Sequence, residues 1–176
     1  MNSLIALWLI VLTGLGSVRE SPPSKADRSD RSQPYRIVAI RARLFYEQSG
    51  TFSVDILSHP EIALWNVIIG EGSAKEPSNS TLVLVEVMGE PGAYAPRRKV
   101  LITARTKPVW SGPFKGRRTI NVRRVITTGI LGKDGKRFAP LWLSDTGCEF
   151  VTITARLLGQ PTSPPVKRTI KFYCGE

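Results

Sequence analysis

A single histidine limits the hydrolytic chemistry that this sequence can support. His59 is the only histidine in the 176 residues, so a serine, histidine and aspartate triad would have to use it as the base. It precedes Pro60, which favours extended backbone in a loop. Asp55 lies four residues earlier and would share a helical face with it, but two ligands do not define a metal site. We therefore expect a surface loop histidine, no metal site and no cofactor.

The tripeptide Asp145-Thr146-Gly147 is a second candidate. It resembles the short catalytic signature of aspartic proteases, in which two such loops bring two carboxylates together to share a proton. The match ends there, because Cys148 follows in place of a small or hydroxyl residue. A turn between two strands is the expectation. The sequence favours a protein that is not an enzyme, and the alternative is a hydrolase centred on Asp145 or His59.

Basic residues are the more prominent feature of the chain. The formal net charge is +11 and the isoelectric point is about 10.2. Residues 44–96 hold seven acids and one base, whereas residues 97–137 hold thirteen bases and one acid. The second segment predicts an electropositive face that attracts an anionic partner. Two alternatives are that basic strands lie beside acidic strands and cancel their charge, or that the charge serves solubility alone.

The expected contact set for an anionic partner comes from the basic segment and an aromatic residue within it. Neighbouring strand residues point to opposite faces, so at most one of Arg123 and Arg124 can join any one patch. Trp110, close to Gly112 in the sequence, is expected to be exposed, whereas Trp142 is expected to be buried in mid-strand. The predicted binding residues are Arg97, Arg98, Lys99, Trp110, Lys115, Arg117 and Arg118.

The N-terminus predicts export, and export limits the choice of partner. Residues 4–15 form an apolar run that is too short to span a membrane and has the length of a signal-peptide core. We expect a signal peptide over residues 1–17, with an uncleaved anchor as the alternative, and a secreted or periplasmic protein without a transmembrane span after cleavage. Nucleic acid is the usual partner of so basic a chain, but export disfavours it. Acidic polysaccharide, an envelope surface or an acidic protein is the expected partner, and oligomeric state is not predicted.

The rest of the chain divides into a linker and one domain. Residues 18–34 are almost all polar, charged or proline and predict a disordered linker. Residues 35–176 then alternate apolar and polar positions over several short runs separated by turn residues. This predicts an all-β domain, an antiparallel β-sandwich of immunoglobulin-like architecture with about seven or eight strands. The expected strands cover residues 38–46, 81–88, 99–106, 118–127, 137–143, 150–158 and 166–174.

Three local expectations remain for the structure to test. Asp134-Gly135 predicts a type I′ turn that joins residues 126–131 and 137–143 as a hairpin. Residues 52–69 predict either a short helix over 53–57 or a strand over 64–69. On the first strand, Val38 is expected to share the buried face with Ile40 and Ala42.

The cysteines Cys148 and Cys174 predict a disulfide bond in an oxidising compartment. A hairpin that sets them opposite each other pairs Val151 with a lysine, whereas a shift of one residue aligns the apolar faces of its two strands. A bulge near Cys148 would satisfy both demands. The alternative is that the two strands lie in different sheets and the disulfide crosses between them.

Overall fold

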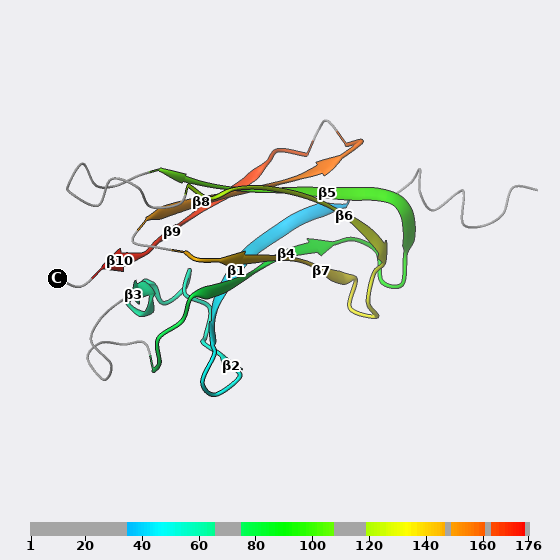
Figure 1. The fold of residues 1–176 in the computed structure, drawn as a ribbon. Helices are drawn as coiled ribbons and strands as arrows, with labels where there is room; N and C mark the ends of the chain where they lie inside the picture. The colour runs from blue at the N-terminus through cyan, green and yellow to red at the C-terminus, as the bar shows by residue number, and fades with distance from the viewer. Residues whose placement is uncertain (1–34, 66–74, 108–118, 147–148, 161–162, 175–176) are drawn as a thin grey trace, which may run out of the picture.

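Two four-stranded antiparallel sheets stack face to face in the computed structural model, which describes residues 35–65, 75–107, 119–146, 149–160 and 163–174 (Figure 1). The first sheet has the order β2-β1-β4-β7 and the second sheet the order β6-β5-β8-β9. The predicted all-β sandwich is therefore confirmed. The first sheet comprises β1 (Arg36–Tyr46), β2 (Thr51–Phe52), β4 (Ser80–Met88) and β7 (Lys136–Ser144), and the second comprises β5 (Tyr94–Lys107), β6 (Asn121–Ile130), β8 (Phe150–Leu158) and β9 (Val166–Lys171).

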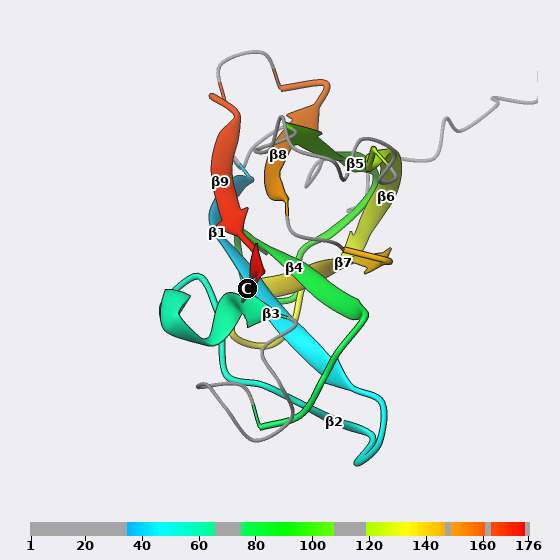
Figure 2. The same ribbon diagram turned by 60° about the vertical axis from the view of Figure 1, so that its left-hand side comes forward.

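A third, smaller pairing closes one side of the sandwich. A 3₁₀ turn, η1 (Pro60–Ala63), leads into β3 (Leu64–Trp65), which pairs in parallel with β10 (Tyr173–Cys174), as Figure 2 shows near the C-terminus. The helix expected over residues 53–57 is wrong. The strand expected over 64–69 is present for its first two residues, and the others lie outside the described residues.

The core lies between the two sheets and follows the alternation in the sequence. The inward positions of β4, β5 and β8 are fully buried, because each strand turns every second side chain toward the opposite sheet. The core residues in these three strands are Val83, Val85, Val87, Ala95, Val100, Ile102, Ala104, Val151, Ile153, Ala155 and Leu157.

One predicted core position is wrong for a local reason. The pairing of β1 with β4 shifts between Ile37 and Ala39, which marks a β-bulge. The extra residue moves Ile37 into the core and turns Val38 outward, where its exposed fraction is 39%. Ile40 and Ala42 beyond the bulge are buried as expected.

A tight turn is present at Lys133-Asp134, but it is not the predicted type I′ turn, because Asp134 has no positive φ, and it does not form a hairpin between the flanking strands. β6 pairs with β5 and β7 pairs with β4, so the chain crosses from the second sheet to the first at this turn. Gly135 has a φ of 73° and donates its N–H to the carbonyl oxygen of Gly132 at 2.9 Å. Its own carbonyl accepts the N–H of Gly89 at 3.0 Å, which ties the turn to the connection between β4 and β5.

The last two long strands adopt the register that the apolar pattern demands. Val151 lies opposite Ile170, and the N–H of Phe172 donates to the carbonyl oxygen of Glu149 at 3.2 Å. Both strands belong to one sheet, so the alternative with β8 and β9 in different sheets is wrong. Cys148, the bulge expected beside it and the side chain of Cys174 lie outside the described residues, so the disulfide stays a prediction.

The domain shares two packed antiparallel sheets with immunoglobulin domains, but its strand order differs from that of a constant domain. When the seven long strands are lettered A to G along the chain, the sheets read A-B-E and D-C-F-G. In an immunoglobulin constant domain the fourth strand lies beside the fifth, whereas here it lies beside the third.

The predicted signal peptide and linker lie outside the described residues. Within the part of the chain that is described, no helix has the length and apolarity to cross a membrane.

Candidate functional site

The structure places three of the seven predicted binding residues. Trp110, Lys115, Arg117 and Arg118 lie outside the described residues. Arg97, Arg98 and Lys99 follow one another in β5, at a bulge in its pairing with β6. Arg97 and Lys99 are exposed, whereas Arg98 is half-buried.

Arg98 makes contacts that hold the domain together. Its Nη1 donates to the carbonyl oxygen of Gly159 at 3.3 Å, and its guanidinium lies 6.0 Å from the ring centre of Tyr35. Tyr35 is almost fully buried, and its carbonyl oxygen accepts a hydrogen bond from Gln160 at 2.9 Å. Arg98 therefore ties the start of β1 to the turn after β8, and we exclude it from the candidate site.

The outer face of the second sheet gathers most of the basic side chains. Its four strands contain eleven bases and no acid. The alternate residues of β5 and β8 fill the core, so the others point away from it. The register then assigns six exposed bases to this outer face, which we call the basic face: Lys99, Arg105, Arg123, Arg156, Lys167 and Lys171.

The register also decides between adjacent arginines, as the alternation predicts. Arg123 lies opposite Thr103, on the outer side of the sheet. Arg124 lies opposite Ile102, which is a core residue, and so belongs to the other side of the edge strand β6. Only Arg123 joins the basic face.

Threonines occupy the middle of the basic face. Thr103 lies opposite Thr154, and Thr152 lies opposite Thr169. The hydroxyls of Thr152 and Thr169 are 3.2 Å apart, and the Thr103 hydroxyl lies 3.4 Å from the Thr154 carbonyl oxygen. The face therefore combines cationic groups with hydroxyls that both donate and accept hydrogen bonds.

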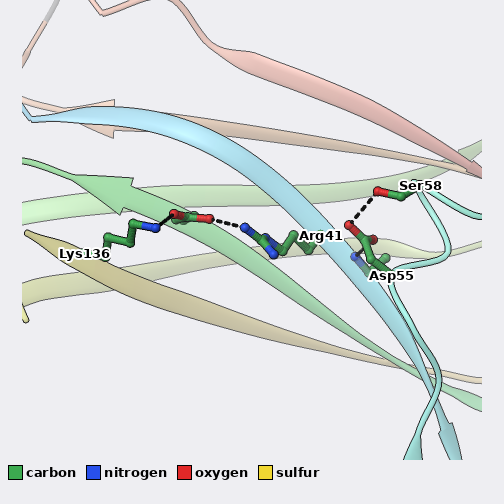
Figure 3. Close-up of polar contacts among 6 residues, drawn as sticks. Arg41, Asp55, Ser58 and Lys136 are labelled. Carbon is green, nitrogen blue, oxygen red and sulfur yellow. Dashed lines mark hydrogen bonds and ion pairs between the residues drawn. The ribbon is translucent and has the colours of Figure 1, made fainter. Parts of the chain in front are cut away.

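Cancellation of charge occurs in the other sheet. Glu86 of β4 lies 2.9 Å from Arg41 and 3.3 Å from Lys136, and its side chain is 4% exposed (Figure 3). β4 pairs with β1 and β7, so this acid is used within the first sheet. The strands of the second sheet have no acidic neighbour of this kind, because none of the four contains a carboxylate.

The outer face of the first sheet is aromatic at one end. The ring of Phe45 lies 5.2 Å from Phe52 and 5.4 Å from Trp142. Trp142 is 40% exposed, so its predicted burial is wrong. The reason is the pleat: Leu141 and Leu143 on either side take the inward positions and Trp142 takes the outward one.

Asp55 acts as a structural cap. Its Oδ1 accepts the N–H of Ala42 at 2.9 Å and that of Leu57 at 3.2 Å. Its Oδ2 accepts the Ser58 hydroxyl at 3.3 Å, as Figure 3 shows. These bonds fasten the segment after β2 to β1, and both carboxylate oxygens face protein donors.

His59 and Asp145 lie in exposed turns. His59 Nδ1 is 3.3 Å from Glu61 Oε1, and both side chains are more than half exposed. Asp145 follows the end of β7 with a φ of 52°, as in a turn. Gly147 of the protease-like tripeptide lies outside the described residues. Among the residues described, no three histidines, cysteines or carboxylates form a group able to hold a metal ion.

Sequence reasoning missed most of the basic face. Arg105, Arg123, Arg156, Lys167 and Lys171 do not belong to the predicted set, and the last three also lie outside the basic segment 97–137. The alternation in residues 150–158 and 166–171 places the last three on polar strand faces. What it does not show is that β6 and β9 flank the same pair of strands.

No protein-family model matches this chain, and no curated protein sequence matches it significantly.

Proposed function

We propose that this protein is an exported binding module, without enzymatic activity, whose basic face holds an anionic partner. The observation that carries the proposal is the set of six exposed bases on four adjacent strands that contain no acid. Like charges held together without counterions attract an anionic surface over a distance comparable to the Debye length, about 8 Å at physiological ionic strength.

The partner class includes acidic polysaccharide, an envelope surface and an acidic protein. All three present several negative charges to a broad surface. The basic face suits such a partner better than a single small anion, because its cations are spread over four strands and do not converge on one point.

Chromatography on heparin tests the proposal. We expect the purified protein to elute from heparin at higher salt than from a plain cation exchanger of equal charge density. Replacing Arg123, Arg156 and Lys167 by serine should remove most of this difference. Elution from heparin no later than from the exchanger would contradict the proposal.

A charge-matched variant provides the control. Lys133, Arg137 and Arg36 are exposed, and none belongs to the basic face. Their replacement by serine lowers the net charge by the same amount and should leave the preference for heparin in place. An equal loss in both variants would show that net charge alone governs retention.

Export and a Cys148–Cys174 disulfide complete the proposal. Mass spectrometry of the protein from its native host should show a mature N-terminus near residue 17 or 18 and a peptide linked through the two cysteines. Closing the loop over residues 148–174 contributes roughly 3.5 kcal/mol to stability in the chain-entropy model. Reduction of the disulfide should therefore lower the midpoint temperature of thermal unfolding. A retained N-terminal segment with two free thiols would refute this part.

A further inference from the structure

We infer that the partner of the basic face is a linear acidic polysaccharide that lies diagonally across the four strands. The inference rests on the proposed function, and it concerns the order of side chains on that face. The strand register places the six bases in two parallel rows with the threonines between them.

The first row runs through Lys99, Arg156 and Lys167. Lys99 lies opposite Leu158, so Arg156 is its diagonal neighbour on β8. Lys167 lies opposite Thr154 and is in turn the diagonal neighbour of Arg156 on β9. Diagonal neighbours on one face are about 7–8 Å apart, so the row spans roughly 16 Å.

The second row runs the same way from Arg123 to Arg105 and ends at Lys171. Arg105 is two residues beyond Thr103, the partner of Arg123. The next diagonal position is Phe150, which lies opposite Lys171. The Lys171 ammonium is 5.8 Å from the centre of the Phe150 ring, so the cation stands beside the line of the row.

Four threonines and the buried Leu101 occupy the space between the rows. Along β5 the two rows are six residues apart, and Thr103 lies between Lys99 and Arg105. With ordinary strand spacing and rise, the Cα atoms of the rows are about 12 Å apart, which leaves room for one chain between flexible basic side chains. The threonines are Thr103, Thr152, Thr154 and Thr169.

This arrangement suits an acidic polysaccharide because the face offers cations for the anionic groups of the sugar chain and hydroxyls for the sugar hydroxyls. Carboxylate or sulfate groups on either edge of the chain would meet the bases. Sugar hydroxyls along the middle would meet the threonine hydroxyls, which donate and accept. A chain without hydroxyls would contact the rows and make no additional hydrogen bonds with the threonine hydroxyls.

The face lacks the features that other polyanions use. Protein interfaces have an apolar core with aromatic residues, whereas the exposed large apolar side chains of this sheet are Val125 beside the rows and the pair of Tyr94 and Ile130 at its far end, beyond the bulge. Single-stranded nucleic acid requires exposed aromatic platforms. Between and along the rows, the aromatic residue that the register places on this face is Phe150, which is half-buried beneath Lys171, whereas the exposed Tyr94 lies beyond the bulge at the other end of β5.

Isothermal titration with three probes tests the inference. We expect a heparin dodecasaccharide to bind at least ten-fold more tightly than a poly-L-glutamate or a polyphosphate of equal charge. Replacing Thr152 and Thr154 by valine, which keeps side-chain shape and strand propensity, should weaken the dodecasaccharide about ten-fold and leave poly-L-glutamate unchanged. Affinity should rise with oligosaccharide length until the chain spans the rows, and then level off.

The outcomes separate this inference from the proposed function. If all three polyanions bind equally and the threonine variant has no effect, the anionic function stands and the polysaccharide inference is refuted. If replacement of Arg123, Arg156 and Lys167 by serine changes no affinity, both are refuted. In amide NMR spectra of the complex, shifts centred on Phe52 and Trp142 of the first sheet would also overturn the inference.

Discussion

At the scale of single residues, the buried carboxylate of Glu86 holds two neighbouring strands to its own. Glu86 lies between Arg41 and Lys136 and is almost inaccessible to solvent, whereas its two cationic partners keep 43% and 36% of their side chains exposed. The asymmetry matters because a cation left without a partner can be hydrated here, but the carboxylate cannot.

Replacing the two sides of this ion pair should therefore have unequal effects. Glu86→Gln should lower the free energy of unfolding by about 1–2 kcal/mol. Arg41→Met combined with Lys136→Met leaves the buried carboxylate without a counterion and should cost about 3–5 kcal/mol. Urea unfolding measures both, and a larger loss in Glu86→Gln would show that the carboxylate is not the constrained group.

Asp55 gives a second prediction at this scale. Asp55→Ala leaves the N–H of Ala42 without its side-chain acceptor and should cost about 1–3 kcal/mol. Asp55→Asn keeps an oxygen for this bond and should cost less than about 1 kcal/mol. His59→Ala, at an exposed position, is the control and should be neutral. Equal losses for Asp55→Ala and His59→Ala in urea unfolding would contradict the role as a cap.

At the scale of elements, bulges and turns decide which face each residue joins. The bulge in β1 exchanges Ile37 and Val38 between core and solvent, and the bulge in β5 absorbs the residues between Ala95 and Lys99. Thr128 spans the second bulge, with its hydroxyl 3.3 and 3.1 Å from the carbonyl oxygens of Ala95 and Arg98. Beyond it, Lys99 begins the regular pairing that builds the basic face.

The turn between β6 and β7 gives the prediction for this scale. Gly135 has a φ of 73°, and a Cβ atom there would clash with the carbonyl oxygen of Gly89. Gly50 has a similar φ of 67° with nothing within 4 Å of its Cβ position. Gly50→Ala should cost about 1 kcal/mol from backbone strain alone, and Gly135→Ala at least about 2 kcal/mol more. Similar thermal midpoints for the two variants would show that the crossing is loosely packed.

At the scale of the whole molecule, the two sheets present different outer faces. The strands of the first sheet carry an exposed aromatic cluster and one acid that pairs with two of their five bases, whereas the strands of the second sheet carry eleven bases and no acid. Eleven of the 25 bases of the chain therefore lie in strands that contain no carboxylate to screen them. Solvent ions must do so instead.

Stability should for this reason rise with salt. Increasing the ionic strength from 0.01 to 0.15 M shortens the Debye length from about 30 to 8 Å, and should raise the free energy of unfolding by about 1 kcal/mol through weaker self-repulsion. Replacing Arg105 and Arg123 by serine should stabilise the protein at low salt and reduce the dependence. Urea unfolding at the two ionic strengths measures this, and stability that is independent of salt would indicate that the charges on the basic face do not interact.

Local pattern was sufficient to predict much of the fold. The strand expected over residues 150–158 has those bounds in the structure, and the strand expected over 81–88 is longer by one residue. The alternation of side chains is set by the backbone of a single strand, so the sequence alone predicts it. The same rule correctly separated Arg123 from Arg124.

Other features depended on which strands are neighbours, and that is a property of the packed chain. Asp134-Gly135 predicted a hairpin, but β7 pairs with β4 and buries Leu141 and Leu143 between the sheets. Trp142 is exposed by the same placement.

The sequence by itself determined an all-β sandwich with a basic half and polar strand faces. Tertiary structure alone decided that Lys167 and Lys171, from the end of the chain, share a surface with Lys99 and Arg123. It also decided that the acid of β4 neutralises bases in the other sheet. The physical reason is that charge along a chain is a local property, whereas a surface is formed by strand pairings between residues far apart in sequence.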